Sequence, residues 1–588
     1  MDENPSSTRP IDRVALACIQ CRARHVKCDA TQPVCNRCRR DGKECTYLKS
    51  RRGGLDKAAL ARRRLALQQA ERAQQADDSV DYSLSAGNSQ DGEREDHTTV
   101  PEFRVLNIVG SMCAASSLTH NINPDRLLDL YYDNFHPSTP VVLPLYYLSQ
   151  RRLSNSHCME NLLSVLHWIG SIYSPSVPSE PYYEVANEQL NKILPKTAFS
   201  VQALLLFAIA QHHYNLRPES RNMLDLAIGI ALEIGMNTKD FAKQHGEGNP
   251  VLEESWRRTY YFLHLCDQHF AVIVSSPFYA LRDISNEVDL PCDDEVYESG
   301  QIPPSMTWKD YEERELAEEE IVFSSIVYLF DIATIVPFIM KQFLQTGTFG
   351  DGIISSVDAK LAIWRSLLPI SKKDPMRPTG KVDEVMFLAH MIATIITMNT
   401  HRPFSSLTYS IEELSTKSFS SPVPFVEPLK QGRGAHTARA LKAADLQTKL
   451  LAIPCNMEHH HVFTLCIVAS MATAQVSACN ILLEGHALSL ARDRVRLSIG
   501  YLNAMGAFWP LGKKMAREVK NVARGTLSGA QKEHAINMDP DAEIEIPQDN
   551  LIWPVDTSSA HVDIYSGIVL PMDWGASLNP SSSSSTLS

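Results

Sequence analysis

The chain has 588 residues, of which 44% are hydrophobic, so it is too long for a single domain and can bury a large core. Its formal net charge is −12, but the segment 13–72 holds sixteen Lys or Arg and five Asp or Glu, which leaves −23 for the rest. A basic N-terminal part on an acidic remainder is typical of a nucleic-acid binder with a second role elsewhere.

The chain shows no signal for secretion or for membrane insertion. Its first seventeen residues are acidic and polar and are predicted to be disordered. The most apolar windows, 201–210 and 461–483, are too short or too rich in Ser, Thr and Gln to span a bilayer, and each is predicted to be a buried helix. We therefore expect an intracellular protein without membrane contact, in which clustered cysteines favour metal over disulfides.

The first predicted element is a module at 18–45 in which the pattern Cys-x2-Cys-x6-Cys occurs twice. Its cysteines are Cys18, Cys21, Cys28, Cys35, Cys38 and Cys45. Zinc prefers four tetrahedral ligands and accepts thiolates, so two ions with separate shells would need more sulfurs than the module has. Six sulfurs suffice when two of them bridge both ions. A metal-storage peptide is the alternative, but the residues between the cysteines are basic, as a phosphate-facing surface requires.

The spacing Cys-x2-Cys-x6-Cys-x6-Cys-x2-Cys-x6-Cys, with Lys27, Cys28 and Asp29 in a row and Pro33 in the middle loop, resembles that of the fungal binuclear zinc cluster transcription factors. The resemblance implies two zinc ions bridged by Cys18 and Cys35. It also implies a helix, CRARHVKC, that enters the major groove at a CGG-type triplet, with His25 reading a base, Arg24 beside it and Lys27 on a phosphate. The residues expected to neutralise the DNA backbone are Arg22, Arg37, Arg39, Arg40 and Lys43.

Two linker segments follow the module. The first, 46–76, is basic and rich in helix formers, and Leu60 and Leu67 lie one heptad apart. A short dimerisation helix, as in the family, and a solvated basic helix along the phosphates both remain open for it, and its basic runs suit nuclear import. The second, 77–120, is polar, acidic and aperiodic, which predicts a disordered linker.

The segment 121–525 is predicted to be all-helical. Its first helix has Asn123 as cap and Pro124 at the first helical position, and a helix pair at 200–237 ends near Gly235. Three segments resemble the regulatory domain that accompanies the zinc cluster in the same family: LLDLYYDNFHPSTPVVLP, EESWRRTYYFLHLCDQHF with the following SSPFYALRD, and HRPF. The expected fold class is mostly α: a small zinc module, a disordered linker, a large all-α regulatory domain and a disordered tail.

No enzyme motif is present in this domain, and we expect none of its residues to be catalytic. Asp267 lies on an apolar helix face and is predicted to pair with an arginine, with Arg282 as the candidate. The glycines of GTFGDG at 347–352 predict a turn between helices. The run His459 to His461 predicts a polar helix entry, and the cysteines from Cys113 to Cys479 are predicted to be small core residues.

The tail, 526–588, alternates acidic residues with Trp553, Tyr565, Trp574 and aliphatic residues, which suits an activation region that docks on a coactivator. The sequence thus predicts a nuclear, zinc-dependent, sequence-specific regulator of RNA polymerase II transcription, by resemblance for a metabolic gene set, and an activator. The alternative is a metabolite-sensing regulator or a repressor, in which the helical domain binds a small molecule or a corepressor.

Overall fold

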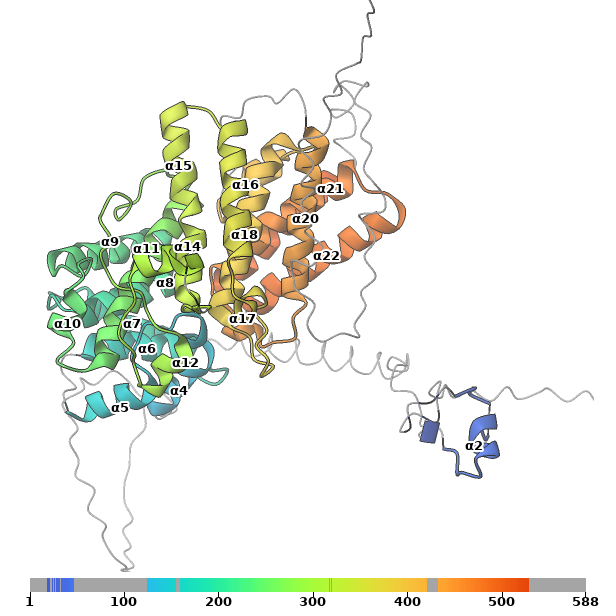
Figure 1. The fold of residues 1–588 in the computed structure, drawn as a ribbon, viewed down its shortest axis with the longest axis horizontal. Coiled ribbons are helices and arrows are strands. Elements are labelled where there is room, and N and C mark those ends of the chain that lie inside the picture. The colour runs from blue at the N-terminus through green and yellow to red at the C-terminus, as the bar shows by residue number, and fades with distance from the viewer. Residues whose placement is uncertain are drawn as a thin grey trace, which may run out of the picture. The chain divides into compact units, whose positions relative to one another are not determined.

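The computed structural model describes residues 18–46, without 19, 22–23, 25, 27 and 32, and residues 124–527, without 155–158, 317, 319 and 420–431. The chain divides into two units, Met1–Ala115 and Ser116–Ser588. In the first unit the described residues include one short helix, α2 (Asn36–Arg40). The second unit is built from helices, and its described residues form no strand beyond the isolated bridges Leu290–Met306 and Met376–Val382. The predicted mostly-α fold is confirmed (Figure 1).

The helical unit begins with a group of helices, of which two long ones, Ala198–His213 and Pro250–Ile273, are almost wholly buried. They are α4 (Pro124–Asn134), the 3-10 turn η1 (His136–Ser138), α5 (Leu145–Ser154), α6 (Glu160–Ile172), α7 (Glu180–Leu190), α8 (Ala198–His213), α9 (Arg217–Glu233), α10 (Phe241–His245) and α11 (Pro250–Ile273). Every residue of α8 is buried, because this helix is apolar nearly all round and other helices pack against it on several sides. Asn249 caps α11 by accepting a hydrogen bond from the Val251 N–H at 3.0 Å, with Pro250 at the first helical position.

The remaining helices complete the unit. They are α12 (Asp294–Ser299), α13 (Trp308–Glu312), η3 (Arg314–Leu316), α14 (Ser325–Ala333), α15 (Ile335–Thr346), α16 (Asp351–Ser366), α17 (Ile370–Lys373), α18 (Glu384–His401), η4 (Arg402–Phe404), α19 (Ile411–Leu414), α20 (Arg433–Leu451), η5 (Met457–His459), α21 (Thr464–Ile481), α22 (Gly485–Met505) and α23 (Pro510–Leu527). One hydrophobic cluster runs from Leu128 to Val519 through both groups of helices, so they share a core.

Two segments, Ser325–Thr346 and Thr464–Ile481, are long and apolar enough to cross a membrane by length and composition alone. The second is α21, of which 78% is buried among neighbouring helices, as in the core of a globular domain. In the first, α14 is buried, whereas Ile335 is the one buried residue of α15. The apolar face of α15 is therefore only partly covered by protein.

Asp267 does pair with an arginine, but the prediction of Arg282 is wrong. Arg221 of α9 donates to Asp267 Oδ1 at 2.8 Å, and the Leu281 N–H donates to Oδ2 at 2.9 Å. Arg282 binds the adjacent Asp283 instead. The partner comes from α9 because α9 packs along α11, a proximity that spacing in the sequence does not reveal.

The histidine run is also different from its prediction. His459 ends η5, but His460 and His461 are 3% and 1% exposed, so they do not form a polar helix entry. His460 Nδ1 lies 2.6 Å from Glu384 Oε2, and Phe387 stacks on its ring. The turn predicted at GTFGDG is confirmed, since it joins α15 to α16 with Gly347 at a φ of +71°.

Candidate metal centre and DNA-binding module

The two Cys-x2-Cys pairs of the N-terminal module have the same local geometry. Cys35 is the N-cap of α2, and its Sγ accepts the Cys38 backbone N–H at 3.3 Å. Cys18 Sγ accepts the Cys21 N–H in the same way, at 3.4 Å. A sulfur at this position receives the free amides at the start of a helical turn, which favour its thiolate form.

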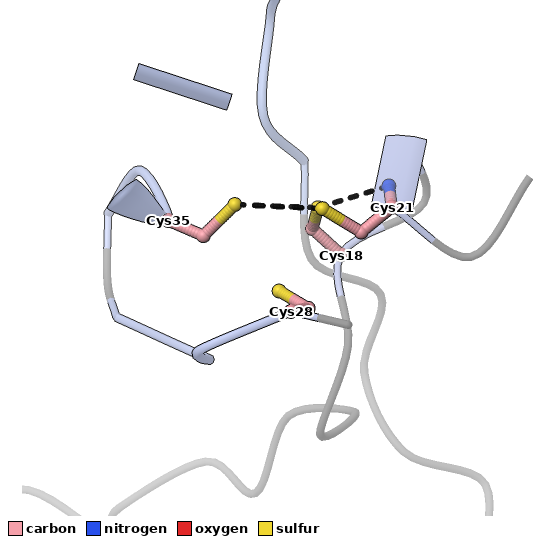
Figure 2. A group of neighbouring side chains, drawn as sticks. All are labelled: Cys18, Cys21, Cys28 and Cys35. Carbon is pink, nitrogen blue, oxygen red and sulfur yellow. Dashed lines mark hydrogen bonds between the residues drawn. The ribbon is translucent and has the colours of Figure 1, made fainter. Parts of the chain in front are cut away.

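The six cysteines of the module come together as two overlapping sets of four sulfurs. One set is Cys18, Cys21, Cys28 and Cys35, and the other is Cys18, Cys35, Cys38 and Cys45. Within each set all sulfurs lie within 4.8 Å of one another, and the sets share Cys18 and Cys35. Figure 2 shows the first set, with the side chains directed toward a common centre.

The distances between the sulfurs fit zinc better than disulfides. Cys18 Sγ lies 3.8 Å from Cys35 Sγ, and Cys21 Sγ lies 3.7 Å from Cys35 Sγ. Four sulfurs bound tetrahedrally at 2.3 Å from zinc are about 3.8 Å apart, whereas a disulfide joins two sulfurs at about 2.05 Å. The cysteines of the module are all free thiols. The donor set therefore suits a pair of zinc ions.

The pKa values of the cysteines in the module differ with their hydrogen bonds and burial. Donation from the Cys38 N–H lowers the pKa of Cys35, and the pKa of Cys18 is lowered by the Cys21 N–H although burial opposes this. Burial raises the pKa of Cys21, and it raises the pKa of Cys38 to about 12. Zinc binds thiolates, so Cys21 and Cys38 would release their protons when the metal binds.

Polar contacts hold the two halves of the module together. Asp29 accepts the Asn36 N–H at 3.1 Å and the Thr31 hydroxyl at 2.6 Å, which ties the middle loop to the start of α2. Arg24 donates to Asp41 at 3.0 Å, beyond the end of α2. Sequence analysis gave Asp29 only as part of a motif and did not single out Asp41, since such contacts depend on the loop conformation.

Four of the predicted DNA-contacting residues lie on or just after α2 with exposed side chains: Arg37, Arg39, Arg40 and Lys43. Arg24 is half-buried, and its guanidinium is held by Asp41. Arg22, His25 and Lys27 lie outside the described residues, so the structure does not place them. The linker 46–76, apart from Thr46, and the linker 77–120 lie outside them too.

Comparison with known proteins decides the family. Residues 16–54 match the Fungal Zn(2)-Cys(6) binuclear cluster domain, and residues 128–344 match the Fungal specific transcription factor domain. The chain is a fungal binuclear zinc cluster transcription factor. It binds zinc, with two ions in the cluster as is usual for this domain, and the cluster domain implies that it binds DNA. It is a transcription factor rather than an enzyme.

Two curated relatives show how far this similarity extends. The factor is 29% identical over 550 residues to the C6 finger domain transcription factor iacK of Pestalotiopsis fici. The aligned residues cover 87% of this chain and 80% of the relative. It is 56% identical over 36 residues to the C6 finger domain transcription factor hasF of Aspergillus fumigatus, 6% of this chain and 5% of the relative. No solved structure matches the chain. The similarity to iacK thus extends far beyond the zinc module into the helical unit.

Proposed function

We propose that this factor acts in the nucleus, where it binds CGG-like triplets and activates RNA polymerase II transcription of a metabolic gene set. The observation that carries the proposal is the pair of four-sulfur sets that share Cys18 and Cys35, in a module whose exposed residues include four arginines or lysines. The similarity to iacK, a transcription factor by its printed name, supports the regulatory role. The metabolic gene set follows from the family resemblance alone.

In this proposal the six cysteines hold two zinc ions, with Cys18 and Cys35 as the bridging ligands. Bound zinc stabilises the fold of this module, because the module has almost no hydrophobic core: its buried cluster consists of cysteines with Val26 and Val34 packed against them. The exposed side chains between the cysteines then determine which groups of the DNA the module contacts. Arg37, Arg39 and Arg40 project from α2, where they suit contacts with phosphates rather than bases.

Base recognition is assigned to His25, because a ring N–H of histidine can donate to guanine N7 or O6 in the major groove. Lys27 is assigned to a phosphate. Arg24 is assigned a different role, because its guanidinium is bound by Asp41. This ion pair fixes the segment that carries His25 against the end of α2. Arg24 is therefore proposed to orient this segment and to add charge beside it.

The test uses the full chain in two steps. Selection from a random duplex library should enrich CGG-containing sequences, and fluorescence anisotropy should then compare a selected site with a scrambled duplex over a range of salt concentrations. His25→Ala should reduce the preference for the selected site by about 1–3 kcal/mol. Lys27→Ala should weaken both duplexes alike and flatten the salt dependence by about one unit of slope.

Three results would each contradict one part of the proposal. Equal losses on selected and scrambled DNA for His25→Ala would show that His25 only positions the module. Binding that persists in the presence of a strong zinc chelator would remove zinc from the mechanism altogether. An enriched sequence without CGG would overturn the proposed target while leaving the zinc cluster intact.

A further inference from the structure

The helical unit contains a cavity of about 250 Å³ among α11, α14, α15, α18 and α21. Its outer wall is α15, which contributes Val336, Ile339, Met340 and Phe343. These residues are spaced i, i+3, i+4 and i+7, so they share one helix face, and all four are half-buried. The apolar face that α15 leaves incompletely covered by protein is thus the face turned to the cavity.

One residue on the wall of this cavity, His461, has a buried polar atom without a partner among the described residues. His461 is 1% exposed, and its Nδ1 accepts the Phe463 backbone N–H at 3.1 Å. Burial lowers the pKa of His461 to about 3, so the ring is neutral. A neutral ring that accepts at Nδ1 carries its proton on Nε2, and Nε2 has no hydrogen-bond partner among the described residues. A buried N–H donor left unpaired is costly and calls for an acceptor.

The described lining of the cavity carries no uncompensated charge. Among the described residues its only charged members are Arg402 and Glu413, which pair with each other through two hydrogen bonds of 2.6 and 2.7 Å. The other histidine on the wall, His269, is kept neutral by burial, which lowers its pKa, and it stacks on Phe463. Thr400, also on the wall, has a buried hydroxyl without a partner among the described residues. An ionised ligand would find no counter-charge here.

We propose that this cavity binds an uncharged, mostly apolar small molecule with a carbonyl oxygen that accepts a hydrogen bond from His461 Nε2. A cavity lined mainly by apolar side chains with a few polar groups is the usual form of a small-molecule site, and this one, at about 250 Å³, is slightly smaller than the roughly 300 Å³ at which the usual range begins. The site belongs to the helical unit, so the inference goes beyond DNA recognition and does not depend on the proposed target sequence.

The test titrates the full-length protein with prodan, a neutral naphthyl ketone whose emission moves to shorter wavelength in apolar surroundings. We expect saturable binding of one probe per chain. Three competitors of similar size then separate the chemistry: 2-acetylnaphthalene should displace prodan best, 2-ethylnaphthalene more weakly because it lacks the carbonyl, and 2-naphthoate least because it is charged. His461→Phe should weaken 2-acetylnaphthalene about three- to tenfold and leave 2-ethylnaphthalene nearly unchanged.

Two substitutions that fill the cavity locate the probe. Ile339→Trp on α15 and Ile395→Trp on α18 should abolish binding, since both residues line the wall. Leu344→Trp is the matched control, because Leu344 is on α15 but is 46% exposed and does not line the cavity. Circular dichroism checks that each variant folds. The proposal is overturned if prodan does not saturate, if both cavity-filling variants bind it normally, or if 2-naphthoate competes as well as the ketone. Equal effects of His461→Phe on ketone and hydrocarbon would remove the hydrogen bond.

Discussion

Cys18 and Cys35 occupy equivalent positions in the two halves of the zinc module. Each is the first cysteine of its Cys-x2-Cys pair, each accepts a backbone N–H from the second cysteine, and each belongs to both four-sulfur sets. Cys45 belongs to one set only, and it accepts the Cys35 N–H at 3.3 Å. A bridging ligand serves both ions, whereas a terminal ligand serves one, so the two kinds of cysteine should respond differently to substitution.

This difference predicts a change in metal content. Cys18→Ser or Cys35→Ser should disrupt both ions of the cluster and abolish specific DNA binding, because each removes a ligand from both sets. Cys45→Ser should retain about one zinc ion, since the set formed by Cys18, Cys21, Cys28 and Cys35 stays complete. Metal analysis of the purified full-length variants measures this directly. If Cys18→Ser and Cys45→Ser retained the same zinc content, the shared-ligand arrangement would be wrong.

The buried pair of His460 and Glu384 is a second feature at the residue scale. The two side chains are 2% and 4% exposed, and His460 also contacts the Cys455 thiol at 3.3 Å, with Tyr501 nearby. Burial alone would lower the pKa of His460, but the hydrogen bonds with Cys455 and Glu384 and the charge of Glu384 raise it to about 9. The folded state therefore binds the proton more tightly than the unfolded chain does.

The stability of the helical unit should accordingly fall as the medium becomes basic. The contribution of the pair is fully present below about pH 6.5, the ordinary pKa of histidine, and is lost as the pH rises through about 9. Its size is roughly 3 kcal/mol of unfolding free energy. Urea unfolding of the wild type at pH 6.5 and pH 9, compared with His460→Gln, measures it. A pH dependence that is the same in both proteins would show that the pair does not cause it.

Only some of these residue-scale contacts could be predicted from the sequence. The two bridging cysteines could be proposed because the family pattern fixes their order in the chain. The Arg221–Asp267 and His460–Glu384 pairs could not, because their members lie 46 and 76 residues apart on different elements. His461 was likewise assigned to a polar helix entry, since a run of histidines gives no sign of which helices will cover it.

At the element scale, α4 and α6 approach each other unusually closely at Gly170. A Cβ atom at Gly170 would lie 1.9 Å from the carbonyl oxygen of Leu127 in α4, which no side chain can occupy. Gly229 offers a matched comparison, because it too lies inside a helix, α9, but a Cβ there would meet nothing within 4 Å. The first glycine is needed for packing, and the second only weakens its helix.

The two glycines should therefore respond to alanine with opposite signs. Gly170→Ala should destabilise the helical unit by about 1–3 kcal/mol or more, because α4 must move away from α6. Gly229→Ala should stabilise it by about 0.5–1 kcal/mol, since alanine is the better helix former and no contact opposes it. Thermal unfolding followed by circular dichroism compares both with the wild type. A neutral Gly170→Ala would mean that α4 and α6 are not in close backbone contact.

The helices themselves could be predicted well where local signals are strong. Pro124 begins α4 as expected, and Gly235, at a φ of +76°, follows the end of α9. The break between α22, which ends at Met505, and α23, which begins at Pro510, was not predicted; the chain turns tightly at Gly506. The cavity could not be predicted, since it depends on how five helices meet rather than on any one of them.

At the scale of the whole molecule, the division of charge along the chain follows the division into a zinc module and a helical unit. The basic excess lies in the segment that contains the zinc module, and the acidic excess lies in the remainder. A metal-dependent module supplies DNA binding, while the larger helical unit has its own hydrophobic core and its own cavity. We expect the effect of DNA binding on transcription to depend on parts of the chain outside the cluster, and the tail is our candidate.

The tail, 526–588, lies outside the described residues apart from Thr526 and Leu527, so its role is argued from sequence. Eight acidic residues from Asp539 to Asp573 alternate with aliphatic and aromatic ones, a composition that predicts an open segment because the carboxylates repel one another. On this prediction its aromatic side chains would dock in an apolar groove of a coactivator. We therefore expect this tail to activate transcription on its own.

Fusing residues 539–588 to an unrelated DNA-binding domain should switch on a reporter gene. Replacing Trp553, Tyr565 and Trp574 together by alanine should silence the fusion, because the docking groups are lost while the charge is kept. Replacing Ser581, Ser582 and Ser583 by alanine is the control and should have no effect. In the full-length factor the aromatic substitutions should leave DNA binding intact, as anisotropy would show. A fusion that is expressed normally but stays silent would exclude the tail as an activation region and favour repression or a scaffolding role for the factor.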